Sequence, residues 1–472
     1  MGREDRPLTT ERTPQTFVIL GANGDLSSRL LLPGIGSLVE SGQFTDLHLV
    51  GCDRQELTAD EWKATLDGSL EEAGIDPEVR QKLASTTSYE QADVTKAADL
   101  ARLLEDHGGS LVLYFALPPA VTITACQELS KLAVPPGTRL ALEKPFGQDA
   151  RTAAEFNELL AGMLPESQIH RVDHFLGLAT VLNIVGLRFA NRTIEPLLNN
   201  HHVASVEIVW DEDLALEGRG GYYDHAGALV DMIQSHLLQV LGFLTMEAPS
   251  AIEARDIRDG TARILRATSI WNDDPARFSR RARYSAGQIG DRQLPSYRDE
   301  EGVDPSRETE TFAEIVVGIA TWRWAGVPFR LRSGKALGNP RKEAIINFRP
   351  PEHLPVGLSG MRRPDRFRIG LGFGADKLRV DLTVNGPGDP WSLDPATLEA
   401  DLGPGSLSEY AEVLKGILND DPTLSVRGDA AVECWRIIDP VRRAWDADEV
   451  PLLEYPAGSR GPSGWPEAGL PG

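Results

Sequence analysis

Cysteine is scarce in this chain of 472 residues, in which only Cys52, Cys126 and Cys434 occur, far apart in the sequence. They form no CxxC pair and no zinc-binding framework, so neither a disulfide scaffold nor a zinc site is expected. At roughly 150 residues per domain, the length suggests about three domains or two large ones, enough to bury a sizeable core without cross-links. A sparse, odd set of cysteines is typical of a reducing compartment, and we expect a cytoplasmic protein without a bound metal.

The chain also lacks an excess of basic residues. The chain has 48 Lys and Arg against 70 Asp and Glu, which gives a formal net charge of −22. An acidic surface repels nucleic-acid backbones and anionic lipids, so we expect neither a nucleic acid nor a membrane as partner. If such a protein binds a phosphate, it has to concentrate its basic residues locally.

Long hydrophobic runs are missing as well. No stretch reaches the roughly 18 consecutive apolar residues of a membrane-spanning helix. Residues 1–14 are polar, mixed in charge and without the apolar core of a signal peptide, and residues 457–472 are rich in Gly and Pro. We therefore expect flexible tails at 1–14 and 457–472.

Between these tails, two patterns of strands and helices predict two domains. In residues 15–173, apolar strands alternate with helices, which predicts an α/β domain with a parallel sheet covered on both faces. In residues 174–456, several strands alternate apolar with polar residues and few helices separate them, which predicts a larger β+α domain with a mainly antiparallel sheet. The predicted strands are 16–20, 47–50, 110–116 and 139–142 in the first domain, and 203–210, 311–320, 344–348, 367–373 and 378–384 in the second.

A glycine-containing turn follows the first predicted strand. It consists of Gly21, Ala22, Asn23, Gly24, Asp25 and Leu26. A glycine turn between a strand and a helix directs backbone N–H groups and the helix dipole at a phosphate, as in dinucleotide-binding folds. The spacing differs from GxGxxG, and a plain tight turn explains the pattern as well.

Asp53 and Arg54 follow the second predicted strand. In dinucleotide-binding folds, an acid at this place binds the ribose 2′-hydroxyl of NAD, whereas an arginine accommodates the 2′-phosphate of NADP. Because both residues are present, the coenzyme preference stays open here. Arg54 is the reason to expect NADP, with NAD possible; the alternative is a pair of solvated loop charges.

Four further motifs follow in order along the chain. They are EKPFG at 143–147, RVDHFLG at 171–177, GRGGYYD at 218–224 with DMIQSH at 231–236, and GKAL at 334–337. With the GxxGDL turn at Gly21, their order and spacing resemble the glucose-6-phosphate dehydrogenase family. The resemblance runs from about Phe17 to the segment 455–462, nearly the whole chain.

This resemblance implies a Rossmann-like NAD(P)-binding domain followed by a β+α substrate and oligomerisation domain. It implies oxidation of C1 of glucose 6-phosphate to the 6-phospho-lactone, with reduction of NADP or NAD, as at the entry to the pentose phosphate pathway. It also suggests a homodimer or homotetramer built on the sheet of the second domain.

Two residues carry the chemistry that the resemblance implies. Removal of hydride from C1 leaves a proton on the 1-hydroxyl, and a histidine that is neutral near pH 7 is a natural base for it. His236 occupies the family's base position. Asp173 matches the carboxylate that orients such a histidine and stabilises its charged form. Without the resemblance, Asp173 would be interpreted as the N-cap of a helix.

The resemblance also assigns the binding residues. Lys144 contacts both coenzyme and substrate, and its bond to Pro145 is cis. The predicted substrate-binding residues are Lys144, His174, Glu212, Asp231, Lys335 and Arg341. Glu212 could equally be a solvated strand charge, and Arg341 aligns only after a one-residue insertion. On an α-helix, Asp231 and His236 would lie about 140° apart and border one cleft without touching.

Basic residues are concentrated between Arg323 and Lys342. This segment holds six Lys and Arg and no acid, so we interpret it as a candidate anion site in an otherwise acidic chain.

Two departures from the family pattern fall where the 6-phosphate should bind. The family usually has DHYLGK, whereas this chain has Phe175 and Leu178 in place of the tyrosine and the lysine. Neither replacement can donate a hydrogen bond to a phosphate. His174, Arg341 and Lys342 are candidates to compensate. The alternatives are a dehydrogenase of another sugar or of unphosphorylated glucose, and a catalytically silent coenzyme-binding regulator.

Overall fold

The computed structural model divides the chain into two compact units, which are described separately. The first comprises residues 1–177 and 406–429, and the second comprises 178–405 and 430–472. The residues described are 15–107, 110–218, 220–360, 363–372, 376–386, 388–403 and 405–463. The predicted tail 1–14, the end 464–472 of the other predicted tail, and Arg219 of the GRGGYYD motif lie outside these ranges.

The first unit contains a seven-stranded sheet in the order β19-β6-β5-β4-β1-β2-β3. Its strands are parallel except β19, which runs antiparallel to β6. The strands are β1 (Gln15–Leu20), β2 (Leu47–Asp53), β3 (Thr87–Gln91), β4 (Ser110–Phe115), β5 (Arg139–Glu143), β6 (Ile169–Val172) and β19 (Ser425–Val426). The chain order reverses between β4 and β1, so the carboxyl edge near these strands is where such folds bind ligands.

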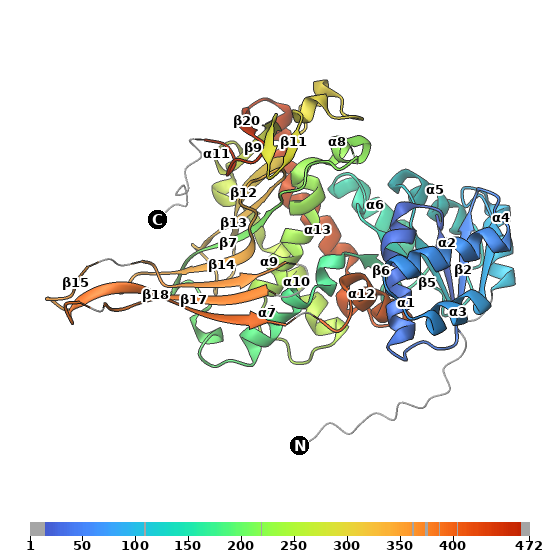
Figure 1. Ribbon diagram of the computed structural model, residues 1–472, viewed down its shortest axis with the longest axis horizontal. Helices are drawn as coiled ribbons and strands as arrows, with labels where there is room; N and C mark the ends of the chain where they lie inside the picture. Colours follow the sequence, from blue (N-terminus) through green and yellow to red (C-terminus); the bar gives the residue numbers. More distant parts are fainter. Residues whose placement is uncertain are drawn as a thin grey trace, which may run out of the picture. The chain divides into compact units, whose positions relative to one another are not determined.

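Helices pack around this sheet in two groups (Figure 1). One group consists of α1 (Leu32–Glu40), α2 (Ala59–Glu72), α3 (Pro77–Thr86) and α12 (Glu409–Leu418); the other consists of α4 (Ala97–Asp106), α5 (Pro119–Leu129) and α6 (Ala150–Ala161). The first group shares a core with Phe17 and Ile19 of β1, both fully buried. The predicted α/β domain is confirmed.

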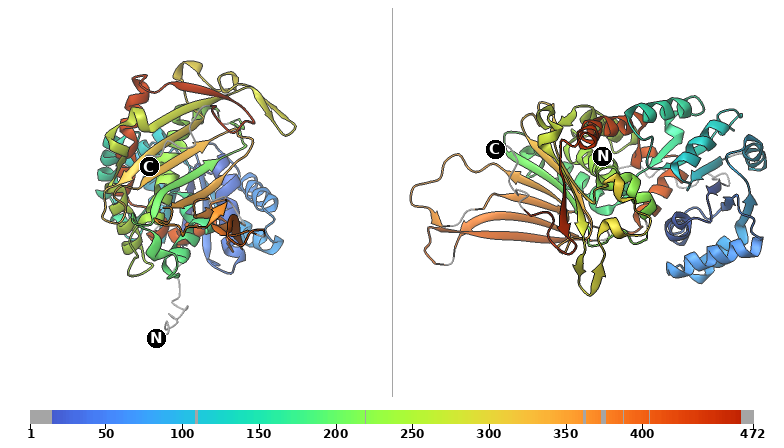
Figure 2. Two further views of the ribbon diagram at one scale, coloured as in Figure 1. Left: turned by 90° about the vertical axis from the view of Figure 1, so that its left-hand side faces the viewer. Right: turned by 90° about the horizontal axis from the view of Figure 1, so that it is seen from above.

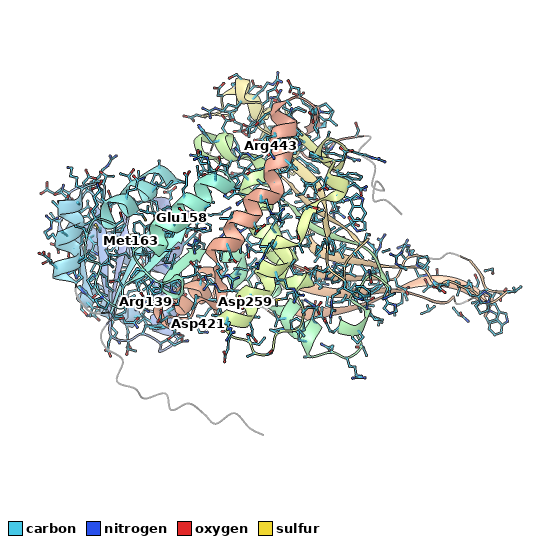
Figure 3. The ribbon with its side chains drawn as sticks, turned by 180° about the vertical axis from the view of Figure 1, so that it is seen from behind. Arg139, Glu158, Met163, Asp259, Asp421 and Arg443 are labelled. Carbon is cyan, nitrogen blue, oxygen red and sulfur yellow. The ribbon has the colours of Figure 1, made fainter. Side chains whose placement is uncertain are left out.

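Helix α12 and strand β19 come from a segment that the sequence analysis assigns to the second domain. In the structure this segment, 406–429, belongs to the first unit. Arg139 of β5 donates hydrogen bonds to the backbone oxygens of Ile417 (2.8 Å) and Leu418 (2.9 Å) at the end of α12. Figure 3 labels Arg139 and Asp421 in this region. The domain is therefore discontinuous in sequence, which strand and helix patterns cannot reveal.

The second unit is built on an eleven-stranded sheet in the order β15-β18-β17-β16-β14-β7-β13-β12-β9-β20, with β8 beside β12. Most pairs are antiparallel, as predicted, but β7–β13, β9–β20 and β15–β18 are parallel. The strands are β7 (Val203–Asp211), β8 (Thr268–Ile270), β9 (Ser279–Ser285), β12 (Phe312–Ile319), β13 (Pro328–Gly334), β14 (Lys342–Phe348), β15 (Ser359–Gly360), β16 (Arg366–Gly370), β17 (Asp376–Asn385), β18 (Ser392–Leu402) and β20 (Leu452–Pro456). A separate hairpin pairs β10 (Gly287–Ile289) with β11 (Arg292–Leu294).

Helices of the second unit lie along this sheet (Figure 2). They are α7 (Ala179–Phe189), α8 (Gly220–Ala228), η5 (Leu229–Leu237), α9 (Leu238–Thr245), α10 (Ala254–Arg266), α11 (Pro275–Phe278) and α13 (Gly428–Asp446, which begins in the first unit). The π-helix η5 packs on β7, β12 and β13. The run Gly220–Thr245 is the one helix among the described residues with the length and composition of a membrane span, and 89% of its most apolar window is buried, as in a core helix.

Candidate active site

The glycine turn lies at the carboxyl end of β1. Gly21 has φ +92°, and a Cβ there would lie 2.3 Å from the backbone oxygen of Ala116, so only glycine fits. The N–H of Gly24 and the hydroxyl of Ser27 both donate to the Gly21 oxygen (3.1 and 2.9 Å). The helix η1 (Ser27–Leu31) begins directly after the turn. This strand–turn–helix arrangement fits a dinucleotide phosphate and supports the predicted role of residues 21–26.

A second loop is held next to this turn. Tyr89 of β3 donates to the backbone oxygen of Gln55 (2.5 Å) and accepts a hydrogen bond from Asn23 (3.2 Å). Gln91 donates to the backbone oxygen of Arg54 (3.0 Å), while the Arg54 side chain is exposed. The loop after β2 is therefore fixed through its backbone, which leaves Arg54 on the surface beside the glycine turn, where an adenosine ribose would lie.

Lys144 follows β5, and its bond to Pro145 is cis, as the resemblance implies. The preceding Glu143 is partly buried, and the desolvation of its carboxyl raises the pKa to about 7. Tyr114 of β4 donates a hydrogen bond to it (2.5 Å). Tyr410 of α12 and Lys144 also lie close enough to lower the pKa, although burial outweighs them. A carboxyl that titrates near neutral pH thus lies next to the predicted coenzyme-binding lysine.

Asp173 and His174 follow β6 at the same edge of the sheet. Asp173 is 1% exposed, and its Oδ1 accepts a hydrogen bond from the N–H of Phe175 (3.1 Å) in the short helix η3 (His174–Gly177). Its capping role, the alternative from sequence, is therefore real, and it is compatible with a further role in catalysis. The His174 ring stacks on Tyr410 with centroids 5.3 Å apart and 15° between the planes.

Glu143 and Tyr410 contact or adjoin the predicted site residues Lys144 and His174, and sequence reasoning missed both. Glu143 lies within the EKPFG motif, which is the signal that could have found it. Tyr410 stands in no motif, far from the others in sequence, and α12 brings it to the edge of the sheet. No signal in a single sequence could have placed it there.

Glu212 and Lys335 meet in the second unit because they follow neighbouring parallel strands. β7 and β13 pair Asp211 with Gly334, so the next residues of both strands leave the sheet together. Lys335 Nζ donates to Glu212 Oε2 (2.6 Å) and lies 5.3 Å from the centre of the Tyr223 ring. Burial opposes ionisation of Glu212, but Lys335 outweighs it and the pKa of Glu212 is lowered. The alternative of a solvated strand charge is wrong for Glu212.

Arg341 lies against a different carboxylate. Its backbone oxygen accepts the N–H of Asp211 (2.7 Å), and its guanidinium Nε lies 3.8 Å from Asp211 Oδ2. Arg332 forms two hydrogen bonds to the same carboxylate (3.0 and 2.8 Å). Burial raises the pKa of Asp211 to about 6 despite these two arginines.

The basic segment 323–342 is not a patch of unpaired cations. Five of its six bases lie within ion-pair distance of carboxylates: Arg323, Arg330, Arg332, Lys335 and Arg341. Acids distant in sequence therefore balance most of the charge of this segment, and an anion site within it stays a prediction. Lys342 lies over the Trp210 ring at 4.7 Å.

Asp231 and His236 both lie on η5, which is a π-helix rather than an α-helix. Hydrogen bonds in a π-helix join residues five apart, so Asp231 and His236 lie one turn apart on the same side. The expectation of 140° between them is wrong, because it assumes α-helical geometry. His236 is 1% exposed and Asp231 is partly exposed. π-Helices are frequent at functional sites, which agrees with the predicted roles.

The two residues that depart from the family pattern are both buried. Phe175 is 2% exposed and its ring contacts that of His174, with centroids 5.2 Å apart. Leu178 is 3% exposed at the start of α7. Both side chains are buried, and because both are apolar, neither offers a polar group to a ligand.

Two family models match this chain, one in each part of the sequence. Residues 18–183 match the family described as glucose-6-phosphate dehydrogenase, NAD binding domain, and residues 185–468 match glucose-6-phosphate dehydrogenase, C-terminal domain. The chain belongs to the glucose-6-phosphate dehydrogenase family. The resemblance inferred from the motifs is confirmed, and so is the order of a nucleotide-binding domain followed by a larger domain.

Several members of the glucose-6-phosphate dehydrogenase family match over almost their full length. The glucose-6-phosphate 1-dehydrogenase of Treponema pallidum (strain Nichols) is 36% identical over 480 residues, covering 95% of this chain and 92% of the relative. That of Mycolicibacterium smegmatis is 34% identical over 470 residues, covering 95% and 94%. A solved structure described as glucose-6-phosphate dehydrogenase in complex with its substrate glucose-6-phosphate superposes with a TM-score of 0.85, at 28% identity and 96% coverage of both chains.

Proposed function

We propose that this chain oxidises C1 of glucose 6-phosphate to the 6-phospho-lactone, with reduction of NADP. The observation that carries the proposal is the match to enzymes named glucose-6-phosphate 1-dehydrogenase over 95% of the chain, with the aspartate and histidine motifs in place. A catalytically silent protein would not need both the aspartate and the histidine. The match favours glucose 6-phosphate over an unphosphorylated sugar.

His236 is the proposed base. It accepts the proton of the 1-hydroxyl as the C1 hydrogen leaves with its electron pair, and a neutral imidazole suits this task near pH 7. When bound, the coenzyme supplies the hydride acceptor. Burial of His236 limits competition from bulk water for the proton. Asp173 is the carboxylate that the family pattern assigns to this base, as an orienting partner.

NADP is the proposed coenzyme, bound by the turn 21–26 with Arg54 and Lys144. Arg54 is exposed beside that turn and can meet a 2′-phosphate with charge-assisted hydrogen bonds. Asp53 next to it accepts a hydrogen bond from the N–H of Gln55 (3.3 Å) and can also accept one from a ribose 2′-hydroxyl. We therefore expect NADP to be preferred and NAD to be accepted.

Glu212, Asp231 and Lys335 are the proposed sugar contacts of the second unit. The Lys335–Glu212 pair holds a donor and an acceptor in fixed positions before substrate arrives, which reduces the entropy lost on binding. Asp231 lies on the same side of η5 as His236, so a sugar at the base lies within its reach. His174 and Arg341 are the proposed phosphate contacts, in place of the missing tyrosine and lysine.

The proposed assembly is a homodimer or homotetramer in the cytoplasm, without nucleic acid or membrane as partner. Exposed apolar side chains lie on β17 and β18, among them Val384 and Leu398, and Trp391 directly before β18 is exposed as well. A second copy of the chain would cover them. Cys52, Cys126 and Cys434 form no disulfide, as suits a reducing compartment.

Product analysis tests the proposed reaction. The purified chain is incubated with glucose 6-phosphate and NADP, the reduced coenzyme is followed by absorbance, and the sugar product is identified by mass spectrometry. We expect one reduced coenzyme for each molecule of lactone, or of the acid formed by its hydrolysis. Absence of coenzyme reduction at saturating glucose 6-phosphate with either NADP or NAD would overturn the proposal.

A further inference from the structure

A three-residue segment of the second unit, Thr309–Thr311, joins two groups of proposed site residues. It lies directly before β12. On one side, the backbone oxygen of Glu310 accepts the N–H of Ala228 (3.2 Å), and the hydroxyl of Thr309 donates to the backbone oxygen of Asp224 in α8 (2.7 Å). On the other side, the backbone oxygen of Thr311 accepts the N–H of Lys335 (2.9 Å).

The Glu310 side chain extends the first of these connections to η5. Its Oε1 accepts a hydrogen bond from the N–H of Leu229 (2.9 Å), the first residue of the π-helix that carries Asp231 and His236. The first N–H groups of a helix have no partner within the helix, and a carboxylate stabilises them both as an acceptor and as a negative charge. Glu310 thus anchors the start of this helix from another part of the chain.

The fit between Glu310 and the helix is close. Glu310 is 8% exposed, and a Cβ at Gly227 would lie 2.3 Å from its Oε1. Gly227 has φ +64°, in the region that favours glycine, and marks the kink between α8 and η5. The carboxylate therefore occupies the space that a side chain at the kink would fill.

Thr311 is fixed on the other side of the segment. Its hydroxyl accepts the N–H of Tyr284 (3.0 Å) and lies 2.9 Å from the hydroxyl of Tyr455. Tyr455 in turn donates to the backbone oxygen of Lys335 (2.7 Å). Both backbone groups of Lys335 are thus held by Thr311 and Tyr455, so the segment 309–311 relates the position of Lys335 to that of η5.

We propose that Glu310 is a positioning residue, which fixes η5, and with it Asp231 and His236, relative to Lys335. This inference rests on the proposed function of those three residues. Glu310 acts through the N–H of Leu229 and does not contact the substrate. A side chain with an acceptor oxygen is suited to this place, because that oxygen faces an N–H group at a helix N-terminus inside the protein.

The charged surroundings of Glu310 are consistent with this role. Burial raises the pKa of its carboxyl to about 7, against the opposing effects of the Leu229 N–H and of Arg281 and Arg442. Tyr223 of α8 faces both Glu310 and Asp231, and its pKa is raised well above its usual value, first by burial and then by these two carboxylates. The acceptor oxygen matters more than the charge, so an amide should replace the carboxylate well.

Two substitutions at Glu310 and one matched control test the proposal. Glu310→Ala removes the acceptor, whereas Glu310→Gln keeps one oxygen in the same place. Glu314→Gln is the control, since Glu314 is another buried glutamate, on β12, whose carboxylate lies 3.9 Å from Arg330. The readouts are kcat, the KM for glucose 6-phosphate, the KM for NADP, and hydrogen exchange of peptides that cover residues 225–240.

Displacement of a catalytic group by about 1 Å can cost roughly 100-fold in rate. We expect Glu310→Ala to lower kcat about 10- to 100-fold and to speed exchange at the start of η5, with the KM for NADP unchanged within about twofold. Glu310→Gln should recover kcat to within about fivefold of the wild type, and Glu314→Gln should behave as wild type.

The outcomes distinguish this proposal from the proposed function. If the wild type does not oxidise glucose 6-phosphate, the proposed function fails, and exchange alone then reports whether Glu310 anchors η5. If Glu310→Ala keeps wild-type kcat and exchange, or if Glu310→Gln is as impaired as Glu310→Ala, the positioning role is wrong. Should Glu310→Ala not fold, Gly227→Ala displaces the same carboxylate from the other side and is expected to give the same loss of kcat with an unchanged KM for NADP.

Discussion

At the scale of single residues, the proposed reaction depends most on His236. Replacement with asparagine keeps a similar size and polarity but removes the basic nitrogen. We expect His236→Asn to lower kcat by about 10²–10⁴, because general-base catalysis contributes that much, with a small change in the KM for glucose 6-phosphate. Steady-state kinetics at saturating NADP measure this. Turnover near that of the wild type would assign the base to another residue.

Arg54 tests the coenzyme assignment. Its exposed side chain can contact a 2′-phosphate that NAD lacks. We expect Arg54→Ala to raise the KM for NADP about 10-fold or more, as the loss of one charge-assisted hydrogen bond of about 1.5–3 kcal/mol implies, and to leave the KM for NAD nearly unchanged. Equal changes in both constants would show that Arg54 does not meet the 2′-phosphate.

Leu178 tests how the substrate phosphate is bound. The family has a lysine at this position, and here the side chain is 3% exposed. If the phosphate of glucose 6-phosphate lies there, Leu178→Lys should lower the KM about 10- to 100-fold through one added charge-assisted hydrogen bond. Leu178→Met is the control for side-chain size.

The opposite result at Leu178 is equally informative. An ammonium that finds no phosphate would be buried without a partner, which lowers stability and activity. A raised KM together with a lowered melting temperature, with Leu178→Met unchanged, would place the phosphate elsewhere.

At the scale of elements, the sequence predicts ends of strands better than it predicts what packs on them. The positions of the turn at Gly21, of Arg54 after β2 and of Lys144 after β5 could be predicted, because each follows an apolar strand. Asp173 was assigned only from the family motif, since no strand was predicted directly before it. Tyr410 could not be predicted, because α12 joins the first unit across more than two hundred residues of intervening chain.

The geometry of η5 was also beyond sequence reasoning. Its apolar periodicity indicates a helix, but nothing in the spacing separates a π-helix from an α-helix, and the angle between Asp231 and His236 depends on that difference. Glu310 shows the same limit. Its place next to Leu229 follows from tertiary packing, since 81 residues separate the two.

The raised pKa of Glu143, which lies at the edge formed by β4, β5 and α12, predicts that the stability of the fold depends on pH. The pKa of Glu143 rises from an ordinary value of 4.5 to about 7, so the folded chain binds this proton more tightly than the unfolded chain. The stabilisation is fully present below pH 4.5 and is lost as the pH rises to about 7.

We therefore expect Glu143→Gln, which stays neutral, to be more stable than the wild type at about pH 8 and similar to it below pH 4.5, by melting temperature. Glu310 titrates in the same range, so the variant should keep part of the pH dependence. If Glu143→Gln changes stability equally at both pH values, folding does not raise the pKa of Glu143.

At the scale of the whole molecule, the sequence predicted two domains of the correct classes. It did not reveal how the basic residues of the second domain pair with acidic residues. An acidic chain with one basic segment suggested an anion site at 323–342. The structure distributes those bases among Glu207, Asp211, Glu212 and Glu247, all distant in sequence. Net charge counts cannot reveal such pairing. The binding of the phosphate therefore depends on few groups, which makes phosphate recognition the most informative property to measure.

We propose above that the chain is a dehydrogenase of glucose 6-phosphate rather than of glucose. The most direct test is the ratio of kcat/KM for glucose 6-phosphate to that for glucose, measured with the wild-type chain at saturating NADP. Two charge-assisted hydrogen bonds to the phosphate, at about 1.5 kcal/mol each, predict a ratio of at least about 100 in favour of glucose 6-phosphate. A ratio near one, or a preference for glucose, would contradict this proposal. Phe175 and Leu178 would then indicate that the substrate is a different sugar.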